Sequence, residues 1–529
     1  MQEFDVIVVG GGSAGSAVAG RLSEDPARSV CLIEAGGTND DWRVKTPGMM
    51  PFLPEDTNWH YSTVPQKGLN GRMGHQPRGR GMGGSSAINA MLYIRGNSWD
   101  YDNWAAMGCT GWAYEDVLPY FKRSESNERG GDAFHGGDGP LSVSDQHSVN
   151  PGSKAFVESA ARLQMPLNED FNGARQAGFG IYQTTTKGGE RWTASRAYID
   201  PVRSRENLHV LTGALTEKLI VENGRVTGVR IQRGGETQTL RARGAVVLSA
   251  GAFGSPHILQ LSGIGPAEHL RYHSIDVVLD KPSVGENLQD HIDYVASFET
   301  RSRDFIGDSL TGTLKMARAM VEHRLRRTGI MTTPYAEAGG FWSADSDAPA
   351  PQIQYHFVPA MLEDHGREKV KGHGFSCHAC VLRPESKGSV RLKSNEPGDM
   401  PAIDPAFLED DRDIALLRAG VRQMYRIFET TPLAEYQMRD RHPVDLDDDD
   451  ALDEMLRDRS DTVYHPVGSC AMGPDDADVL TPRLKFRGLE GLYIADASVM
   501  PKIVSGNTNA PSIMIGERCA DFLREDLRG

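Results

Sequence analysis

The segment that decides the fold is FDVIVVGGGSAGSAVAGRLSEDPARSVCLIEAGG, residues 4–37. The apolar residues Val6 to Val9 predict a strand, the glycines after them a turn, and the small residues that follow a helix packed closely on a sheet. A second apolar stretch, residues 30–34, predicts the next strand. This order predicts a βαβ unit and an α/β fold with a Rossmann-like start.

The glycines of this segment have the spacing Gly-x-Gly-x-x-Gly, and a glutamate follows nineteen residues after the last of them. Such glycines permit a tight turn and a close approach of a pyrophosphate, while the helix N-terminus favours its charge and the carboxylate accepts ribose hydroxyls. The pattern predicts a dinucleotide site without choosing between NAD and FAD. The expected contacts are Gly10, Gly12, Ser13, Ala14, Gly15, Glu34 and Ala35.

Length and composition restrict the remaining possibilities. A chain of 529 residues is too long for one hydrophobic core, and 58 glycines suit a large α/β enzyme better than a helical bundle. The net charge of −15 argues against nucleic-acid binding. We find no secretory signal and no stretch long enough to span a membrane, so we expect a cytoplasmic protein with at most a peripheral contact to the inner membrane.

Six scattered cysteines do not suggest a disulfide-rich scaffold. Cys377 and Cys380 form a CxxC pair with histidines beside it, but there is no second CxxC, and the surrounding FSCHACVL alternates like a strand. We therefore expect no metal site.

The sequence pattern changes between about residues 295 and 460, where a predicted helix precedes several predicted strands. After residue 460 the pattern returns to that of the first domain. We expect a discontinuous nucleotide-binding domain, interleaved with a second domain built on a mixed or antiparallel sheet flanked by helices. The expected boundaries are 1–150, 190–295 and 461–529 for the first domain, and 151–189 and 296–460 for the second.

Three further segments bear on the cofactor: GRGMGGSSAINAML at 79–92, GAFGSPHILQLSGIGP at 251–266 and VGENLQDH at 284–291. One nucleotide loop together with several distant, backbone-rich loops suits a long cofactor. With the first glycine loop, these segments resemble the signature segments of the glucose-methanol-choline (GMC) oxidoreductase family along essentially the whole chain. The resemblance implies FAD, a two-part flavin fold, and oxidation of an alcohol to an aldehyde or ketone by hydride transfer to flavin N5.

The same resemblance implies residue roles. TVYHPVGS matches the family's catalytic-histidine segment at His465, and SGNTNAPSIMIGE matches its second catalytic position at Asn509. An imidazole suits removal of the hydroxyl proton, and an amide can hold the developing oxygen charge. The further implied FAD contacts are Arg80, Gly83, Gly84, Ser85, Asn89, Ala90, Met91, Leu92, Thr216, Ala250, Gly251, Asp496, Ala497, Asn507, Asn509 and Ala510.

One departure from the family concerns attachment of the cofactor. Some members hold FAD covalently through a histidine at the position that corresponds to Ile88. Because isoleucine has no nucleophilic nitrogen, we expect non-covalent FAD.

The substrate is less defined than the reaction. The expected substrate contacts are Trp59, Glu337, His356, Tyr464, His465 and Asn509, and Trp342 is a further candidate. Carboxylate and aromatic groups would suit choline, yet similar segments occur in relatives that oxidise L-sorbose and other primary alcohols. We favour a non-choline alcohol, with choline dehydrogenase or oxidase activity as the alternative and a hydroxynitrile-lyase-type flavoprotein as a further one.

The sequence leaves several choices of electron acceptor and oligomeric state. The electron acceptor is a quinone, a dye or O2, with a dehydrogenase favoured over an oxidase, and the protein is a monomer or homodimer. The cationic stretch LKMARAMVEHRLRR, 314–327, is interpreted as a solvated helix or a lid in preference to a membrane contact.

Overall fold

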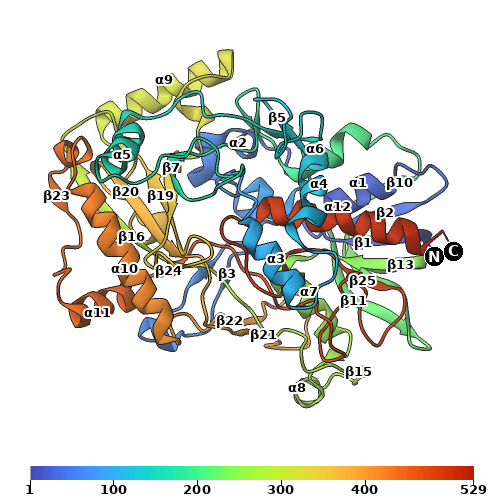
Figure 1. Cartoon of the computed structure of the whole chain (residues 1–529). Coiled ribbons are helices and arrows are strands. Elements are labelled where there is room, and N and C mark those ends of the chain that lie inside the picture. The colour runs from blue at the N-terminus through green and yellow to red at the C-terminus, as the bar shows by residue number, and fades with distance from the viewer. Residues whose placement is uncertain (1, 529) are drawn as a thin grey trace.

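The computed structural model describes residues 2–528, and its two large sheets lie at opposite ends of the molecule (Figure 1). The first sheet has the order β10-β2-β1-β13-β12-β11, with β25 paired to β13. Its parallel strands are β1 (Gln2–Val9), β2 (Val30–Ile33), β10 (Leu208–Leu211), β13 (Glu236–Leu248) and β25 (Leu492–Ile494).

The βαβ unit predicted at the N-terminus is present. Helix α1 (Ser13–Leu22) connects β1 to β2 and packs against α12 (Asn509–Asp526), the last helix of the chain. Gly10 has a φ of 105°, and a side chain at Gly15 would place its Cβ 1.9 Å from the carbonyl oxygen of Gly10. Glycine is therefore required at positions 10 and 15, by the conformation of the turn and by how closely α1 approaches it.

An Asn-Gly turn joins two strands of the first sheet. Strands β11 (Ala214–Glu222) and β12 (Arg225–Arg233) form an antiparallel hairpin at the edge of the first sheet. Asn223 and Gly224 both have positive φ, as a tight hairpin turn requires.

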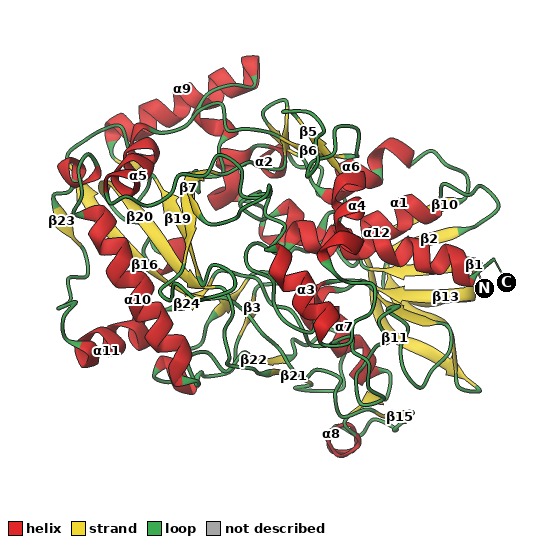
Figure 2. Ribbon diagram, in the orientation of Figure 1, coloured by secondary structure: helices red, strands yellow, loops and turns green. Residues whose placement is uncertain are grey.

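The second sheet has the order β23-β16-β20-β19-β18-β7, and every pair in it is antiparallel. Figure 2 shows helices α10 (Asp411–Phe428) and α5 (Pro151–Arg162) beside it, and residues of both helices belong to its core. The α/β class and a second sheet flanked by helices are confirmed. The strands are β7 (Gly178–Ile181), β16 (Ile292–Thr300), β18 (Ala338–Trp342), β19 (Ile353–Val358), β20 (Gly372–Val381) and β23 (Arg439–Asp440).

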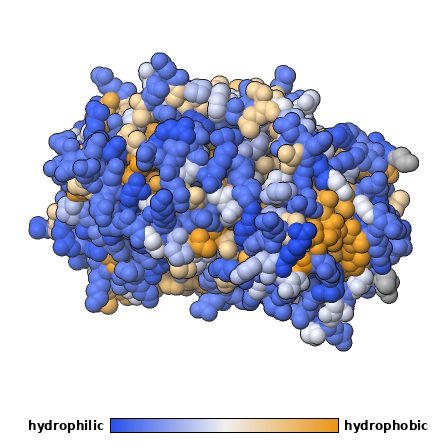
Figure 3. Space-filling view, turned by 90° about the horizontal axis from the view of Figure 1, so that it is seen from below, coloured by the Kyte–Doolittle hydropathy of each residue, from blue (hydrophilic) through white to orange (hydrophobic). Residues whose placement is uncertain are grey.

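Each sheet has its own hydrophobic core, and the chain passes between the two cores more than once. Helix α7 (Gly251–Leu261) follows β13, and α12 begins at Asn509. Both helices start near the middle of the molecule (Figure 1). Seen from below, the surface is mainly hydrophilic, apart from an apolar patch toward the end that holds the first sheet (Figure 3). The space between the sheets is where the predicted functional segments meet.

Candidate active site

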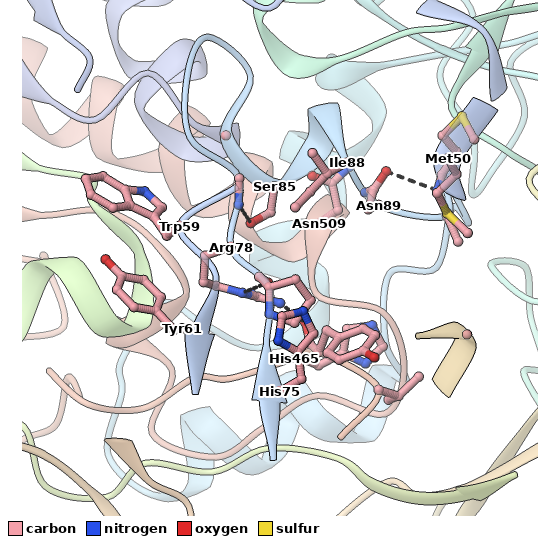
Figure 4. Close-up of a pocket in the computed structure, with 18 of the residues that line it drawn as sticks. Met50, Trp59, Tyr61, His75, Arg78, Ser85, Ile88, Asn89, His465 and Asn509 are labelled. Atoms are coloured by element: carbon pink, nitrogen blue, oxygen red, sulfur yellow. Dashed lines mark hydrogen bonds between the residues drawn. The ribbon is translucent and has the colours of Figure 1, made fainter. Parts of the chain in front are cut away.

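A cavity of about 1190 Å³ runs from the turn after β1 to the loop that carries His465, and its lining comes from both halves of the molecule (Figure 4). Most residues predicted to contact the cofactor line it: Gly10, Gly12, Ser13, Ala14, Glu34, Ala35, Gly84, Ser85, Asn89, Ala90, Met91, Leu92, Thr216, Ala250, Gly251, Asp496, Ala497, Asn507 and Asn509.

Four predicted cofactor contacts are not part of this lining, within the described residues 2–528: Gly15, Arg80, Gly83 and Ala510. Gly15 packs on the backbone of Gly10 in the turn after β1, and Ala510 is buried in the first core. The guanidinium of Arg80 lies over the ring of Trp59, 5.0 Å from its centroid. These residues shape or support the walls instead of facing the cavity.

The nucleotide end of the cavity fits a dinucleotide. Helix α1 begins with no side-chain cap and no acidic residue in its first turn, so its first N–H groups suit an anion. The Glu34 carboxylate accepts hydrogen bonds from the backbone N–H groups of residues 11, 36 and 81, which fixes it at the cavity wall. The hydroxyl oxygen of Thr216 is buried, lines the cavity and lacks a partner within residues 2–528. These groups suit the ribose and phosphates of the expected FAD.

A second carboxylate and a second helix start lie close to the start of α1, since the Ser13 hydroxyl donates to Asn509 at 2.7 Å. The Asp496 carboxylate accepts hydrogen bonds from the Gly251 N–H at 2.9 Å and the Ser255 hydroxyl at 2.6 Å, which holds it beside the start of α7. Helix α12 also begins without a side-chain cap or an acidic residue in its first turn. The cavity therefore combines two uncapped helix starts with two carboxylates held by hydrogen bonds.

The backbone at His465 is held by a buried carboxylate. Asp290 accepts hydrogen bonds from the His465 N–H at 2.8 Å, the Thr462 hydroxyl at 2.6 Å and the Gln76 amide at 3.1 Å. Burial raises the pKa of Asp290 to about 6. Tyr464, directly before the histidine, has a φ of 72°, a left-handed conformation that a bulky residue adopts only when its surroundings enforce it. The position of the imidazole is thus strongly determined.

A chain of hydrogen bonds fixes the tautomer of that imidazole. His291 Nε2 lies 3.0 Å from the carbonyl oxygen of Leu382, and a carbonyl can only accept, so Nε2 carries the proton. His291 Nδ1 is then an acceptor, and it lies 3.0 Å from His465 Nδ1, which must donate. His465 therefore carries its proton on Nδ1, and its Nε2 is unprotonated.

The contact at Nε2 agrees with this assignment. The amide nitrogen of Asn507 lies 3.0 Å from His465 Nε2 and donates to it. We expected Asn509 at this place. Instead, Asn509 is the first residue of α12, and its amide oxygen accepts from the Ser13 hydroxyl at 2.7 Å. The amide that faces His465 in the structure is Asn507, which the sequence had suggested as a cofactor contact.

Electrostatics keep His465 neutral. Burial lowers its pKa well below the usual 6.5, and His291, His356 and Arg78 lower it further. The same burial lowers the pKa of His291 to about 4 and that of His356 to about 3. At neutral pH, His465 thus presents an unprotonated nitrogen to the cavity.

Among the predicted substrate contacts, Trp59, His356 and Tyr464 line the cavity. The ring of Trp59 stacks on Tyr61, with 5.8 Å between their centroids. The backbone carbonyl oxygen of Tyr464 accepts a hydrogen bond from the Arg78 guanidinium at 2.6 Å.

The prediction for Glu337 is wrong. Its carboxylate is fully buried and is not part of the cavity lining within residues 2–528. It accepts from the Asn150 N–H at 2.6 Å and the Ser153 hydroxyl at 2.8 Å, at the start of α5. A carboxylate at a helix N-terminus satisfies otherwise unpaired N–H groups and favours the helix dipole. Trp342 packs against the second core and is likewise not among the lining residues of the described chain.

The CxxC pair lies inside β20. Both thiols are buried, and burial raises the pKa of Cys377 and of Cys380 well above the usual value. Within residues 2–528, no group of three or more His, Cys, Asp or Glu side chains is arranged to hold a metal ion. In this environment both residues behave as small apolar side chains.

No role was predicted from the sequence for three residues of the site: Asp290, His291 and Arg78. The first two belong to VGENLQDH, which we identified as a signature segment, so that segment was their available signal. The contact between His291 and His465 joins residues 174 apart, which no local pattern reports.

Among the described residues, no helix is both long and apolar enough to cross a membrane.

Comparison with known proteins gives a consistent result. Two sequence models described as GMC oxidoreductase match the chain, one at residues 4–293 and the other at residues 384–516. An alcohol dehydrogenase [acceptor] from Pseudomonas putida is 41% identical over 98% of this chain and 95% of its own length. An oxygen-dependent choline dehydrogenase from Burkholderia pseudomallei (strain 1710b) is 41% identical over 99% of this chain and 94% of its own length.

Solved structures share the fold. Pyridoxine 4-oxidase from Mesorbium loti superposes with a TM-score of 0.90 at 31% identity, with 99% of each chain covered. A formate oxidase superposes with a TM-score of 0.93 at 25% identity, covering 100% of this chain and 99% of the other.

Proposed function

Because the chain belongs to the GMC oxidoreductase family, we propose that it oxidises a primary or secondary alcohol to an aldehyde or ketone with FAD bound in the cavity. FAD, when bound, supplies the hydride acceptor. The observation that carries the proposal is the bare Nε2 of His465, held in the cavity by a chain of hydrogen bonds that permits one tautomer. A base that is neutral at working pH is what removal of a hydroxyl proton requires.

His465 and Asn507 have different roles in this reaction. His465 Nε2 takes the hydroxyl proton of the alcohol, while its Nδ1–H stays donated to His291. The Asn507 amide, which occupies Nε2 in the resting site, donates to the substrate oxygen as negative charge develops there. Asn509, which also lines the cavity, is the second candidate for this donor role.

We propose that FAD is held without a covalent bond. Ile88 lines the cavity beside Ser85 and Asn89, and its side chain offers no nucleophile. Acid precipitation of the holoprotein should release the yellow colour into the supernatant. A yellow pellet after washing would overturn the proposal.

We propose an uncharged alcohol as the substrate. The carboxylate expected to attract a cation, Glu337, is buried at the start of α5 instead of lining the cavity. The rings of Trp59, Tyr61 and Tyr464 do line it, and together with the relatives named choline dehydrogenase they make choline the second candidate. We favour a dehydrogenase over an oxidase, with a quinone or a dye as acceptor.

The test is an anaerobic substrate panel read at the flavin absorbance of the holoprotein. We expect bleaching by aliphatic or aryl alcohols at lower concentrations than by choline. Efficient bleaching by choline would overturn the preference for an uncharged alcohol. If the Glu337→Gln variant were bleached by choline equally well, the aromatic rings would be the groups that bind the choline cation. Absence of bleaching by alcohols, L-sorbose, polyethylene glycols and choline would favour a lyase of the hydroxynitrile type and sink the proposed oxidation.

A further inference from the structure

Helix α9 (Leu310–Arg326) projects from the surface at the top of the molecule (Figures 1 and 2). It starts at Ser309, whose hydroxyl accepts from the Gly312 N–H at 3.0 Å, and it ends where Arg327 adopts a left-handed conformation. Its buried residues are Gly312, Ala319 and His323. The helix is therefore anchored along one narrow side and leaves most of its remaining surface exposed.

The side turned away from the protein is apolar. Leu310, Leu314, Val321 and Leu325 are 80%, 64%, 59% and 76% exposed. Their spacings of four, seven and four residues place them within roughly 60° of one another around the helix, since each residue adds about 100°. A solvated helix carries polar residues on such a face, so this stripe of four apolar side chains, the outer stripe, calls for a partner.

Positive charge accompanies the outer stripe. Arg318 and Arg324 lie on its two sides, Lys315 and Arg326 lie farther round the helix, and Glu322 is the one acidic residue in α9. The whole chain, in contrast, carries a net charge of −15. A local cationic helix on an acidic protein indicates attraction to an anionic surface.

The position of α9 links the outer stripe to the cavity. Gly312, Thr313, Met316, Ala317 and Met320 line the cavity, so the helix forms part of its wall. Met316 also packs against the small cluster of Met49, Ala319 and Met331. A surface that contacts the outer stripe would therefore lie next to the cavity wall.

We propose that the outer stripe of α9 docks on an anionic phospholipid bilayer, with the helix lying in the plane of the interface. Apolar side chains on one face and flanking arginines are the features of helices that lie on membranes without crossing them. Docking would let an apolar alcohol or a lipid-soluble acceptor reach the cavity from the bilayer. Binding to lipid does not depend on the proposed oxidation, so each can fail alone.

The test is sedimentation of the holoprotein with vesicles of phosphatidylcholine alone or mixed with phosphatidylglycerol. We expect binding to the anionic vesicles that weakens as salt is added. A Leu314→Glu/Leu325→Glu variant, which keeps good helix formers in α9, should bind at least about tenfold more weakly. Arg318→Glu/Arg324→Glu should weaken binding to anionic vesicles as well.

The matched control is Tyr272→Glu, because Tyr272 is 83% exposed on α8 (Ala267–Tyr272), away from α9. This variant should bind vesicles as the unaltered protein does. Flavin reduction by a water-soluble alcohol should be unchanged in the Leu314→Glu/Leu325→Glu variant, which shows that the fold survives. Failure of the unaltered protein to bind anionic vesicles would overturn the proposal. So would a self-association in solution that the same variant abolishes, because a second copy would then cover the stripe.

Discussion

The nucleotide end of the cavity and its histidine end are built from different kinds of contact. At the nucleotide end, Gly10, Gly15 and Glu34 lie within one strand–turn–helix–strand unit of the first sheet. At the histidine end, His465 is set by Asp290 and His291, which are 175 and 174 residues away in the chain. Local geometry thus defines the nucleotide end, whereas long-range contacts define the protonation state of His465.

Apart from removal of His465 itself, the largest expected effect concerns the nucleotide end. Gly15→Ala would place a Cβ 1.9 Å from the Gly10 carbonyl oxygen, so we expect a loss of about 3 kcal/mol in stability and of most bound FAD. Thermal unfolding and flavin content measure both. Gly37→Ala is the matched control, since its Cβ would meet nothing within 4 Å. Equal stability of the two variants would show that the close packing of α1 is not essential.

The next effect separates the two amides. Asn507→Ala should slow anaerobic flavin reduction on the order of 10²-fold, because it removes a donor to the developing oxyanion. Asn509→Ala, the same change two residues later, should slow it less, because that amide faces Ser13. A larger loss in Asn509→Ala would favour the assignment expected from the sequence over the contact seen in the structure.

A smaller effect tests the positioning role of His291. His291→Leu removes the acceptor for His465 Nδ1–H, and we expect flavin reduction to slow roughly tenfold to a hundredfold, in line with partners that fix a histidine's tautomer. His291→Asn, whose amide oxygen can accept that hydrogen bond, should recover part of the rate at the same FAD content. Equal rates in the two variants would contradict control of the tautomer by this residue.

The smallest effect is on the pH profile. Only neutral His465 accepts a proton, and its lowered pKa means that protonation takes place at a lower pH than in an ordinary histidine. The rate of flavin reduction should therefore stay nearly constant from about pH 8 down to about pH 6.5. Stopped-flow measurement of flavin reduction across this pH range checks the prediction. A rate that already falls at pH values above the ordinary histidine pKa would contradict a lowered pKa of His465.

The same contrast explains what could be predicted from the sequence. The βαβ unit depends on neighbouring residues, and its pattern indicated it correctly. The loop with Ser85 and Asn89, which we expected to contact the cofactor, lines the cavity. Glu337 was misassigned because its partners, Asn150 and Ser153, lie on a helix about 187 and 184 residues earlier. Which of two nearby amides, Asn507 or Asn509, faces the histidine depends on where α12 begins, and the sequence pattern does not define that.

The most direct test of the central claim is anaerobic flavin reduction in a His465→Ala variant that retains FAD. We predict a rate lower by roughly 10² to 10⁴-fold, the range expected for removal of a general base. His356→Ala, the same change at another histidine of the cavity, should cost far less. Near-normal reduction in His465→Ala would contradict the assignment of His465 as the base.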